Sequence, residues 1–159
     1  MNHFELFGLP ISLKIDRGKL ASKYFELQKK YHPDFFTRGT EYERELALET
    51  SSQVNKALKI LKNEDETIKY LLRLKGLLEE EEKYQLPPEF LMEMMELNEE
   101  LSENSAQQIS GIEKEIYLEV KAIIENYDDA TTTTAELLKL KEYYYKKKYL
   151  QRILDRIEG

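Results

Sequence analysis

The residues best suited to recognition chemistry form the tripeptide His32-Pro33-Asp34. Proline pushes the residue before it out of helical backbone angles, so the tripeptide ends a helix and opens a loop. An imidazole and a carboxylate then flank a rigid proline, and they offer a hydrogen-bond donor and an acceptor to a partner. A lone histidine before a helix break is more often a solvated or capping residue, so the interpretation depends on the surrounding elements.

The element that must position this tripeptide is a predicted helix over about residues 17–31, with Asp16 as its N-cap. One apolar stripe recurs along it at helical spacing: Leu20, Tyr24, Leu27 and Tyr31. Lys19, Lys23 and Lys30 repeat at the same spacing about 100° further round the helix. The helix therefore has a core face and a separate basic face. Such a face steers an acidic partner, although a lysine stripe is also typical of a solvated surface.

The rest of the pattern is helical, and the sequence predicts an all-α fold. Gly and Pro are few, at 6 and 4 residues. After a short aromatic turn near Phe4, we expect helices over about residues 41–62, 67–75, 89–103, 106–127 and 134–157. Thr40, Ser105 and Thr133 are predicted N-caps, each followed three residues later by Glu or Gln. Short connections between the last three helices predict a three-helix bundle.

The two halves of the chain differ in charge. The net charge is −7, yet residues 1–75 hold 14 Lys/Arg against 11 Asp/Glu, whereas residues 76–159 hold 10 against 20. Opposite signs predict two modules with different partners. We expect a domain over 1–75, a linker over 76–86 that contains four consecutive glutamates, and a second domain over 87–159. The acidic total argues against nucleic-acid binding.

The composition also excludes several kinds of site. The chain has no cysteine, so it has no disulfide, thiolate metal site or iron–sulfur ligand of its own. His3 and His32 are the only histidines, and no Gly-rich phosphate loop is present. We therefore expect no metal, no cofactor and no enzymatic activity. No apolar run reaches the roughly 18 residues of a membrane span, and the N-terminus lacks a signal pattern. These features favour a cytoplasmic protein without a membrane partner.

The order of features in the first half resembles a J-domain, a helical hairpin with this tripeptide in its loop. The resemblance covers about residues 1–75 and is carried by residues 4–10 (FELFGLP) and 27–34 (LQKKYHPD). It implies that this half docks on a DnaK-class chaperone and stimulates its ATP hydrolysis. The residues that it assigns to chaperone binding are His32, Pro33 and Asp34, supported by Lys23, Lys29 and Lys30.

The first helix of the second half has two apolar faces. A stripe that suits a bundle core consists of Phe90, Met94, Leu97 and Leu101. Leu91, Met92 and Met95 point elsewhere, and Glu96 and Glu99 lie beside them. An extra apolar face with acidic neighbours favours a partner surface, and methionine suits such surfaces. A helix in the middle of a bundle would instead bury both faces.

Residues 90–101 (FLMEMMELNEEL) resemble the C-terminal domain of the HscB family, the J-type co-chaperones of iron–sulfur cluster assembly. The resemblance then covers almost the whole chain. It implies an HscA-type ATPase as the partner of the J-domain and the scaffold IscU as the partner of the bundle. The scaffold-binding residues that it implies are Leu91, Met92, Met95, Glu96 and Glu99, joined by an aromatic residue, Tyr143 or Tyr144. The chain departs from the family at Thr67, where a basic residue is frequent.

Other functions suit the sequence less well. A generic J-protein with a different client shares the first half and differs only in the partner of the bundle. A His-phosphotransfer protein needs its acceptor in mid-helix, whereas His32 ends a helix. A helical metal protein needs paired ligands, and no histidine here has one at ligand spacing. A coiled coil needs sustained heptads, whereas these stripes break at caps and turns every 15–25 residues or so.

Overall fold

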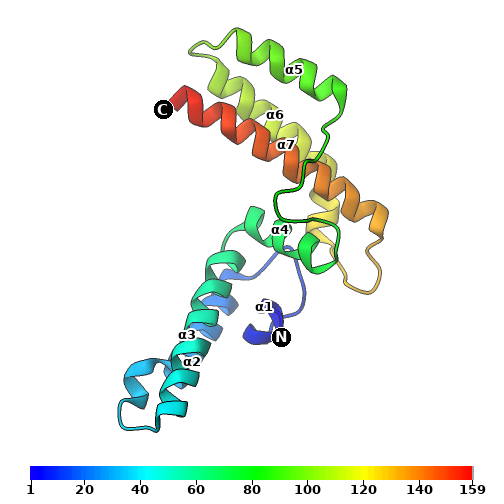
Figure 1. The fold of residues 1–159 in the computed structure, drawn as a ribbon. Coiled ribbons are helices and arrows are strands. Elements are labelled where there is room, and N and C mark those ends of the chain that lie inside the picture. The colour runs from blue at the N-terminus through cyan, green and yellow to red at the C-terminus, as the bar shows by residue number, and fades with distance from the viewer. Residues whose placement is uncertain (159) are drawn as a thin grey trace. The chain divides into compact units, whose positions relative to one another are not determined.

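The computed structural model describes residues 1–158, and every regular element in that range is a helix (Figure 1). The chain divides into two compact units, Met1–Tyr70 and Leu71–Gly159. The predicted all-α fold, a helical hairpin followed by a three-helix bundle, is confirmed. No helix within the described range is both long and apolar enough to cross a membrane.

The first unit is built on an antiparallel pair of helices. Its elements are α1 (His3–Phe7), α2 (Arg17–Tyr31), the 3-10 turn η1 (Pro33–Phe36), α3 (Glu41–Leu61) and the start of α4 (Glu64–Leu74). Helices α2 and α3 pack side by side, and η1 lies in the connection between them (Figure 1). The bounds predicted for α2 are those observed. The loop that contains the tripeptide is therefore held at the far end of a hairpin.

Local capping explains where α2 and α3 begin. The Asp16 carboxylate accepts the Lys19 N–H at 2.9 Å, and the Thr40 hydroxyl accepts the Glu43 N–H at 3.1 Å. Each bond satisfies a backbone donor that the helix itself cannot pair. Both predicted N-caps are confirmed.

The core of the first unit lies where α1 meets the α2–α3 pair. Its buried residues are Phe4, Phe7, Leu20, Val54, Ala57 and Leu61. Gly8 ends α1 with a φ of 64°, a left-handed conformation that glycine adopts without a side-chain clash. The chain then turns sharply enough for both phenylalanines to enter the core.

Helix α4 begins earlier than the sequence predicted. The Asn63 side chain accepts the Glu66 N–H at 3.0 Å and caps a helix that starts at Glu64, so residues 63–65 are a cap and first turn. Thr67 is buried, and its hydroxyl lies 2.9 Å and 2.8 Å from the carbonyl oxygens of Ile60 and Asn63. Thr67 therefore stabilises the α3–α4 turn and presents no surface to a partner.

The second unit contains α5 (Pro88–Glu99), α6 (Ser105–Glu125) and α7 (Thr134–Glu158). Successive helices run antiparallel (Figure 1). Their buried residues include Phe90, Met94, Ile109, Ile116, Val120, Ile124, Leu137, Leu140, Tyr143, Leu150 and Ile153. One stripe of each helix thus faces a shared core, as the apolar spacing predicted.

Two details of the predicted bundle are wrong. Leu101 was placed in the core stripe of α5, but the helix ends at Glu99 and Leu101 is exposed. Ser105 was predicted as the N-cap of α6, but it lies inside the helix and is buried. Its hydroxyl accepts the Ser102 N–H at 2.8 Å, and this contact stabilises the preceding turn instead. The N-cap predicted at Thr133 is confirmed, because its hydroxyl accepts the Glu136 N–H at 3.2 Å.

The segment over residues 76–86 is non-helical and contacts α7. The Lys141 ammonium lies 2.6 Å from the Glu82 carboxylate, and the rings of Tyr84 and Tyr145 stack with centroids 4.5 Å apart. The hydrogen bond from Lys141 lowers the pKa of Glu82, and a backbone N–H bond from Glu79 adds to the effect. An ion pair and a ring stack therefore anchor the segment before α5 begins.

Glu82→Gln removes the charge opposite Lys141, whose side chain is 13% exposed. We expect the free energy of unfolding to fall by about 1–2 kcal/mol at neutral pH. Because the pKa of Glu82 is lowered in the folded state, its contribution is present above the usual carboxyl pKa. The contribution is lost as the pH falls through the lowered value. Urea unfolding across the acid range, with exposed Glu103→Gln as control, should show a difference that shrinks at low pH. A pH-independent difference contradicts this account.

Candidate functional site

The candidate site of the first unit is the tip formed by His32, Pro33 and Asp34. Pro33 occupies the first position of η1, and His32 before it is extended, with φ −62° and ψ 132°. The His32 Nδ1 accepts the Asp34 N–H at 3.2 Å and lies 3.6 Å from Asp34 Oδ2. Since Nδ1 is an acceptor, the neutral ring carries its proton on Nε2. The tip is thus held by its own hydrogen bond.

Both polar side chains of the tip remain accessible. The side chain of His32 is 45% exposed and that of Asp34 is 84% exposed. Phe35, which the sequence analysis did not single out, is exposed beside them, and its ring meets the His32 ring edge-on at 6.2 Å. The signal for Phe35 in the sequence is an aromatic residue directly after the tripeptide. The structure therefore groups an imidazole, a carboxylate and a phenyl ring at the loop.

The predicted cations lie on α2, which leads to the tip. Lys29 and Lys30 are exposed in its last turn, where their charge also favours the carbonyl end of the helix. Lys23 lies further back, and its ammonium is 3.8 Å from the Glu26 carboxylate. Because this ion pair is exposed to solvent, its attraction is weak, and Lys23 still contributes positive charge to this face of α2. The structure brings Lys29 and Lys30 next to the tip, with Lys23 two turns earlier.

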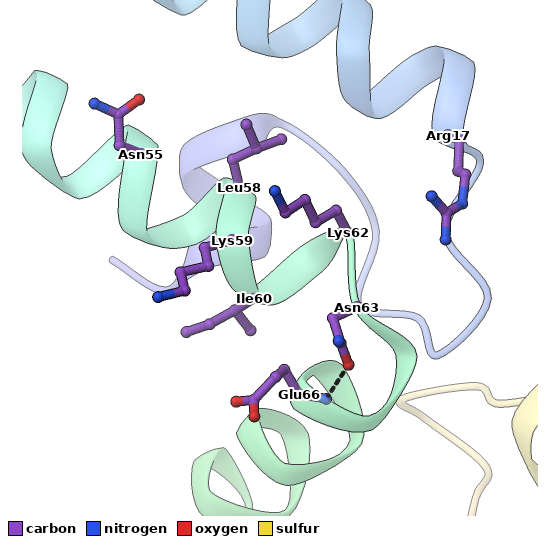
Figure 2. Close-up of a pocket in the computed structure, with 8 residues that line it drawn as sticks. All are labelled: Arg17, Asn55, Leu58, Lys59, Ile60, Lys62, Asn63 and Glu66. Atoms are coloured by element: carbon purple, nitrogen blue, oxygen red, sulfur yellow. Dashed lines mark hydrogen bonds between the residues drawn. The ribbon is translucent and has the colours of Figure 1, made fainter. Parts of the chain in front are cut away.

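A second feature of the first unit is an open cavity of about 780 Å³ away from the tip. It lies where α2 begins, α3 ends and α4 begins (Figure 2). Figure 2 shows Asn63 bonded to the Glu66 backbone, with Arg17 at the start of α2, Lys59 on α3 and Lys62 directly after α3. None of the predicted site residues lines this cavity. The side-chain oxygen of Asn63 is already used to cap α4.

The candidate site of the second unit is the α5 face, defined as Leu91, Met92, Met95, Glu96 and Glu99. Phe90 and Met94 are buried, whereas Met92 is 63% exposed and Met95 is 59% exposed. Glu96 and Glu99 are exposed and Leu91 is half-buried. Helix α5 therefore does not bury both faces. Two exposed methionines beside carboxylates form an apolar patch with an acidic rim.

The tyrosines of α7 divide between core and surface. Tyr143 is only 4% exposed, and its ring meets that of Tyr117 edge-on at 6.2 Å. Tyr144 and Tyr145 are half-buried. Tyr145 and Leu91 line the same groove, so Tyr145 is the tyrosine of this run that lies beside the α5 face. Tyr143, which the resemblance put forward for scaffold binding, contributes mainly to the core. The sequence leaves open whether Tyr143 or Tyr144 faces a partner. The choice depends on which tyrosine the bundle buries, and that residue is Tyr143.

Known proteins share features of the sequence and the fold of this chain. Residues 86–158 match the family described as "HSCB C-terminal oligomerisation domain". The solved structure of the chaperone HscB from Vibrio cholerae is 30% identical, covers 99% of this chain and 96% of its own, and superposes with a TM-score of 0.68. The chain belongs to the HscB family of co-chaperones. The solved human HscB co-chaperone is 28% identical, covers 99% of this chain and 81% of its own, and superposes with a TM-score of 0.80.

The HscB relatives also match at the sequence level. A co-chaperone HscB homologue from Vibrio vulnificus is 47% identical over 104 residues, which is 65% of this chain. A homologue from Vibrio cholerae is 43% identical over 107 residues, or 67% of this chain. The chain spans 61% and 63% of the length of these two HscB homologues. The match to the HscB C-terminal domain includes the α5 face and all of α7 up to residue 158.

Substitutions at the tip should leave the fold intact. His32→Gln and Asp34→Asn both change exposed side chains. The local bond at 3.2 Å joins the His32 ring to the backbone N–H of residue 34, so Asp34→Asn leaves its donor in place. We expect each to change the free energy of unfolding by less than about 1 kcal/mol. Thermal unfolding of the two variants beside the wild type checks this. A loss several times larger would mean that the tip is a structural element.

Truncation of Tyr143 should lower the free energy of unfolding far more than truncation of Met92 or Met95. Tyr143→Ala removes a buried ring and should cost about 3–5 kcal/mol of unfolding free energy. Met92→Ala and Met95→Ala remove exposed side chains and should change it by less than about 0.5 kcal/mol. Urea unfolding measures all three. Equal effects at the three positions would contradict the assignment of Tyr143 to the core.

Proposed function

We propose that this chain is a co-chaperone adaptor that couples an HscA/DnaK-class ATPase to an IscU-type iron–sulfur scaffold. The observation that carries the proposal is a pair of exposed surfaces, one on each unit. The tip and its lysines lie on the first unit, and the α5 face lies on the second. The polar side chains of the tip and the two methionines of the α5 face are therefore free to contact a partner. The chain acts as an adaptor in the cytoplasm and is not itself the enzyme.

The first surface suits the ATPase. Lys23, Lys29 and Lys30 attract an acidic face over long range, which raises the rate of encounter. The tip then makes short-range contacts from a preformed loop, because Pro33 and the His32 bond to the Asp34 backbone fix its geometry. A preformed loop loses little conformational entropy on binding. Stimulation of ATP hydrolysis at this surface is what the J-domain resemblance implies.

The second surface suits the scaffold. Met92 and Met95 offer flexible apolar contacts that fit an irregular partner surface. Glu96 and Glu99 on the same side of α5 favour a partner whose apolar patch has basic neighbours. Assignment to the scaffold rests on membership of the HscB family and on the resemblance of residues 90–101.

One chain that holds both partners makes their meeting intramolecular. The scaffold is then present at the ATPase at an effective concentration far above its free concentration. The nucleotide site belongs to the ATPase partner. The printed sequence has no phosphate-binding loop with which this chain would hold ATP.

Single-turnover ATP hydrolysis by an HscA-type chaperone tests both halves of the proposal. The chain and an IscU-type scaffold are added separately and together. We expect stimulation by the chain, synergy with the scaffold, and loss of both in His32→Gln. Met92→Ala/Met95→Ala should keep the stimulation by the chain but lose the synergy, with scaffold affinity about tenfold weaker or more.

Leu118→Ala is the matched control, because Leu118 is an exposed apolar residue of α6 outside the α5 face. It should behave as the wild type. Stimulation without synergy would remove the scaffold from the proposal and leave a generic J-protein with another client. The absence of stimulation with any DnaK-class chaperone would overturn the proposal as a whole.

A further inference from the structure

A groove of about 590 Å³ lies beside the α5 face within the second unit. Its lining comes from the segment before α5, the start of α5 and α7 from its middle, at Tyr145, to Arg152. Leu91 belongs both to this groove and to the α5 face, so the two surfaces are continuous. A partner seated on Met95 reaches the groove directly, because Leu91 lies one turn earlier on the same side of the helix.

The apolar part of the groove is made of fixed aromatic rings. Tyr84 and Tyr145 stack nearly parallel, at 8° between their planes. Tyr149 meets the buried Phe90 edge-on at 6.2 Å. Burial raises the pKa of both Tyr84 and Tyr145, so their hydroxyls are neutral. Rings already held by packing can receive an apolar side chain at little entropic cost.

The charged part of the groove is basic, although the second unit is acidic. Lys83, Lys148 and Arg152 line it, and none of the three makes an ion pair with any residue between 1 and 158. The Glu82 carboxylate also lines it, but it pairs with Lys141. Lys148 and Arg152 are four residues apart on α7 and share one side of it. The groove is therefore a cationic, aromatic site beside an acidic patch.

We propose that this groove receives an acidic segment of the scaffold protein that docks on the α5 face, a proposal that rests on the function proposed above. Carboxylates of that segment pair with Lys148 and Arg152, and an adjacent apolar side chain rests on Tyr145 and Tyr149. The scaffold then meets acidic Glu96 and Glu99 on one side and basic α7 on the other. Opposite charges at the two ends of one interface fix the orientation in which the partner binds.

Binding of an IscU-type scaffold to the full chain, measured by titration calorimetry, tests the groove. The groove variant is Lys148→Glu/Arg152→Glu. Its matched control is Lys114→Glu/Lys121→Glu, which makes the same change of net charge at exposed lysines of α6 outside the groove. We expect the groove variant to bind about tenfold more weakly at low salt and the control to change by less than about threefold. The milder Lys148→Gln/Arg152→Gln should fall between the wild type and the groove variant.

A charge swap identifies what occupies the groove. Single Asp→Lys or Glu→Lys changes are made on the scaffold. At one or two scaffold positions, such a change should restore binding of the groove variant. The same changes should not restore binding of Met92→Ala/Met95→Ala. Weak binding of Met92→Ala/Met95→Ala with a groove variant equal to its control overturns the groove proposal and leaves the proposed function standing. Wild-type binding by every variant, or no binding by the wild type, overturns both. Equal unfolding temperatures establish that the variants fold.

Discussion

Each unit of this chain depends on the burial of one apolar stripe per helix, because the chain has no cysteine with which to cross-link itself. A stripe occupies only part of a helix surface, so the remainder is available for recognition. Helix α5 illustrates the division within a single element. Phe90 and Met94 join the core, while Met92 and Met95 on other sides of the same helix stay exposed. Core residues and exposed residues of α5 are thus separate, and the α5 face can change without loss of the fold.

The tip depends on a different constraint, the chemistry of proline. Pro33 has no N–H to continue α2 and holds His32 in an extended conformation. That conformation turns the His32 ring toward the Asp34 N–H, which the ring accepts. The tip is therefore fixed by bonds within three residues. It needs only that α2 and α3 hold the loop in place, and this explains how exposed groups can have a defined geometry.

Features set by neighbouring residues could be predicted from the sequence. The bounds of α2 and the caps at Asp16 and Thr40 follow from local hydrogen bonding and helical spacing. Features set by distant residues could not. The burial of Tyr143 and the place of Tyr145 beside Leu91 depend on how α7 packs in the bundle.

Some misses were themselves local. The helix predicted from residue 67 starts too late because Asn63 caps α4, and Ser105 matches a capping pattern while its hydroxyl accepts a bond from the previous turn. The run of glutamates over residues 79–82 predicts repulsion between neighbouring carboxylates. Nothing nearby in the sequence indicates that Glu82 forms an ion pair with Lys141. Charge patterns within a segment describe that segment alone, whereas the partner of a charge is decided by the tertiary fold.

The exposed thioethers of the α5 face have a chemical consequence. Peroxide converts methionine into a polar sulfoxide, and accessibility decides which methionines react first. Met92 and Met95 are open to the solvent, whereas Met94 between them is fully buried. Mild oxidation therefore makes the α5 face polar and leaves the core sulfur intact. The chain would stay folded yet lose its apolar contact, and methionine sulfoxide reductases would be the enzymes able to restore it.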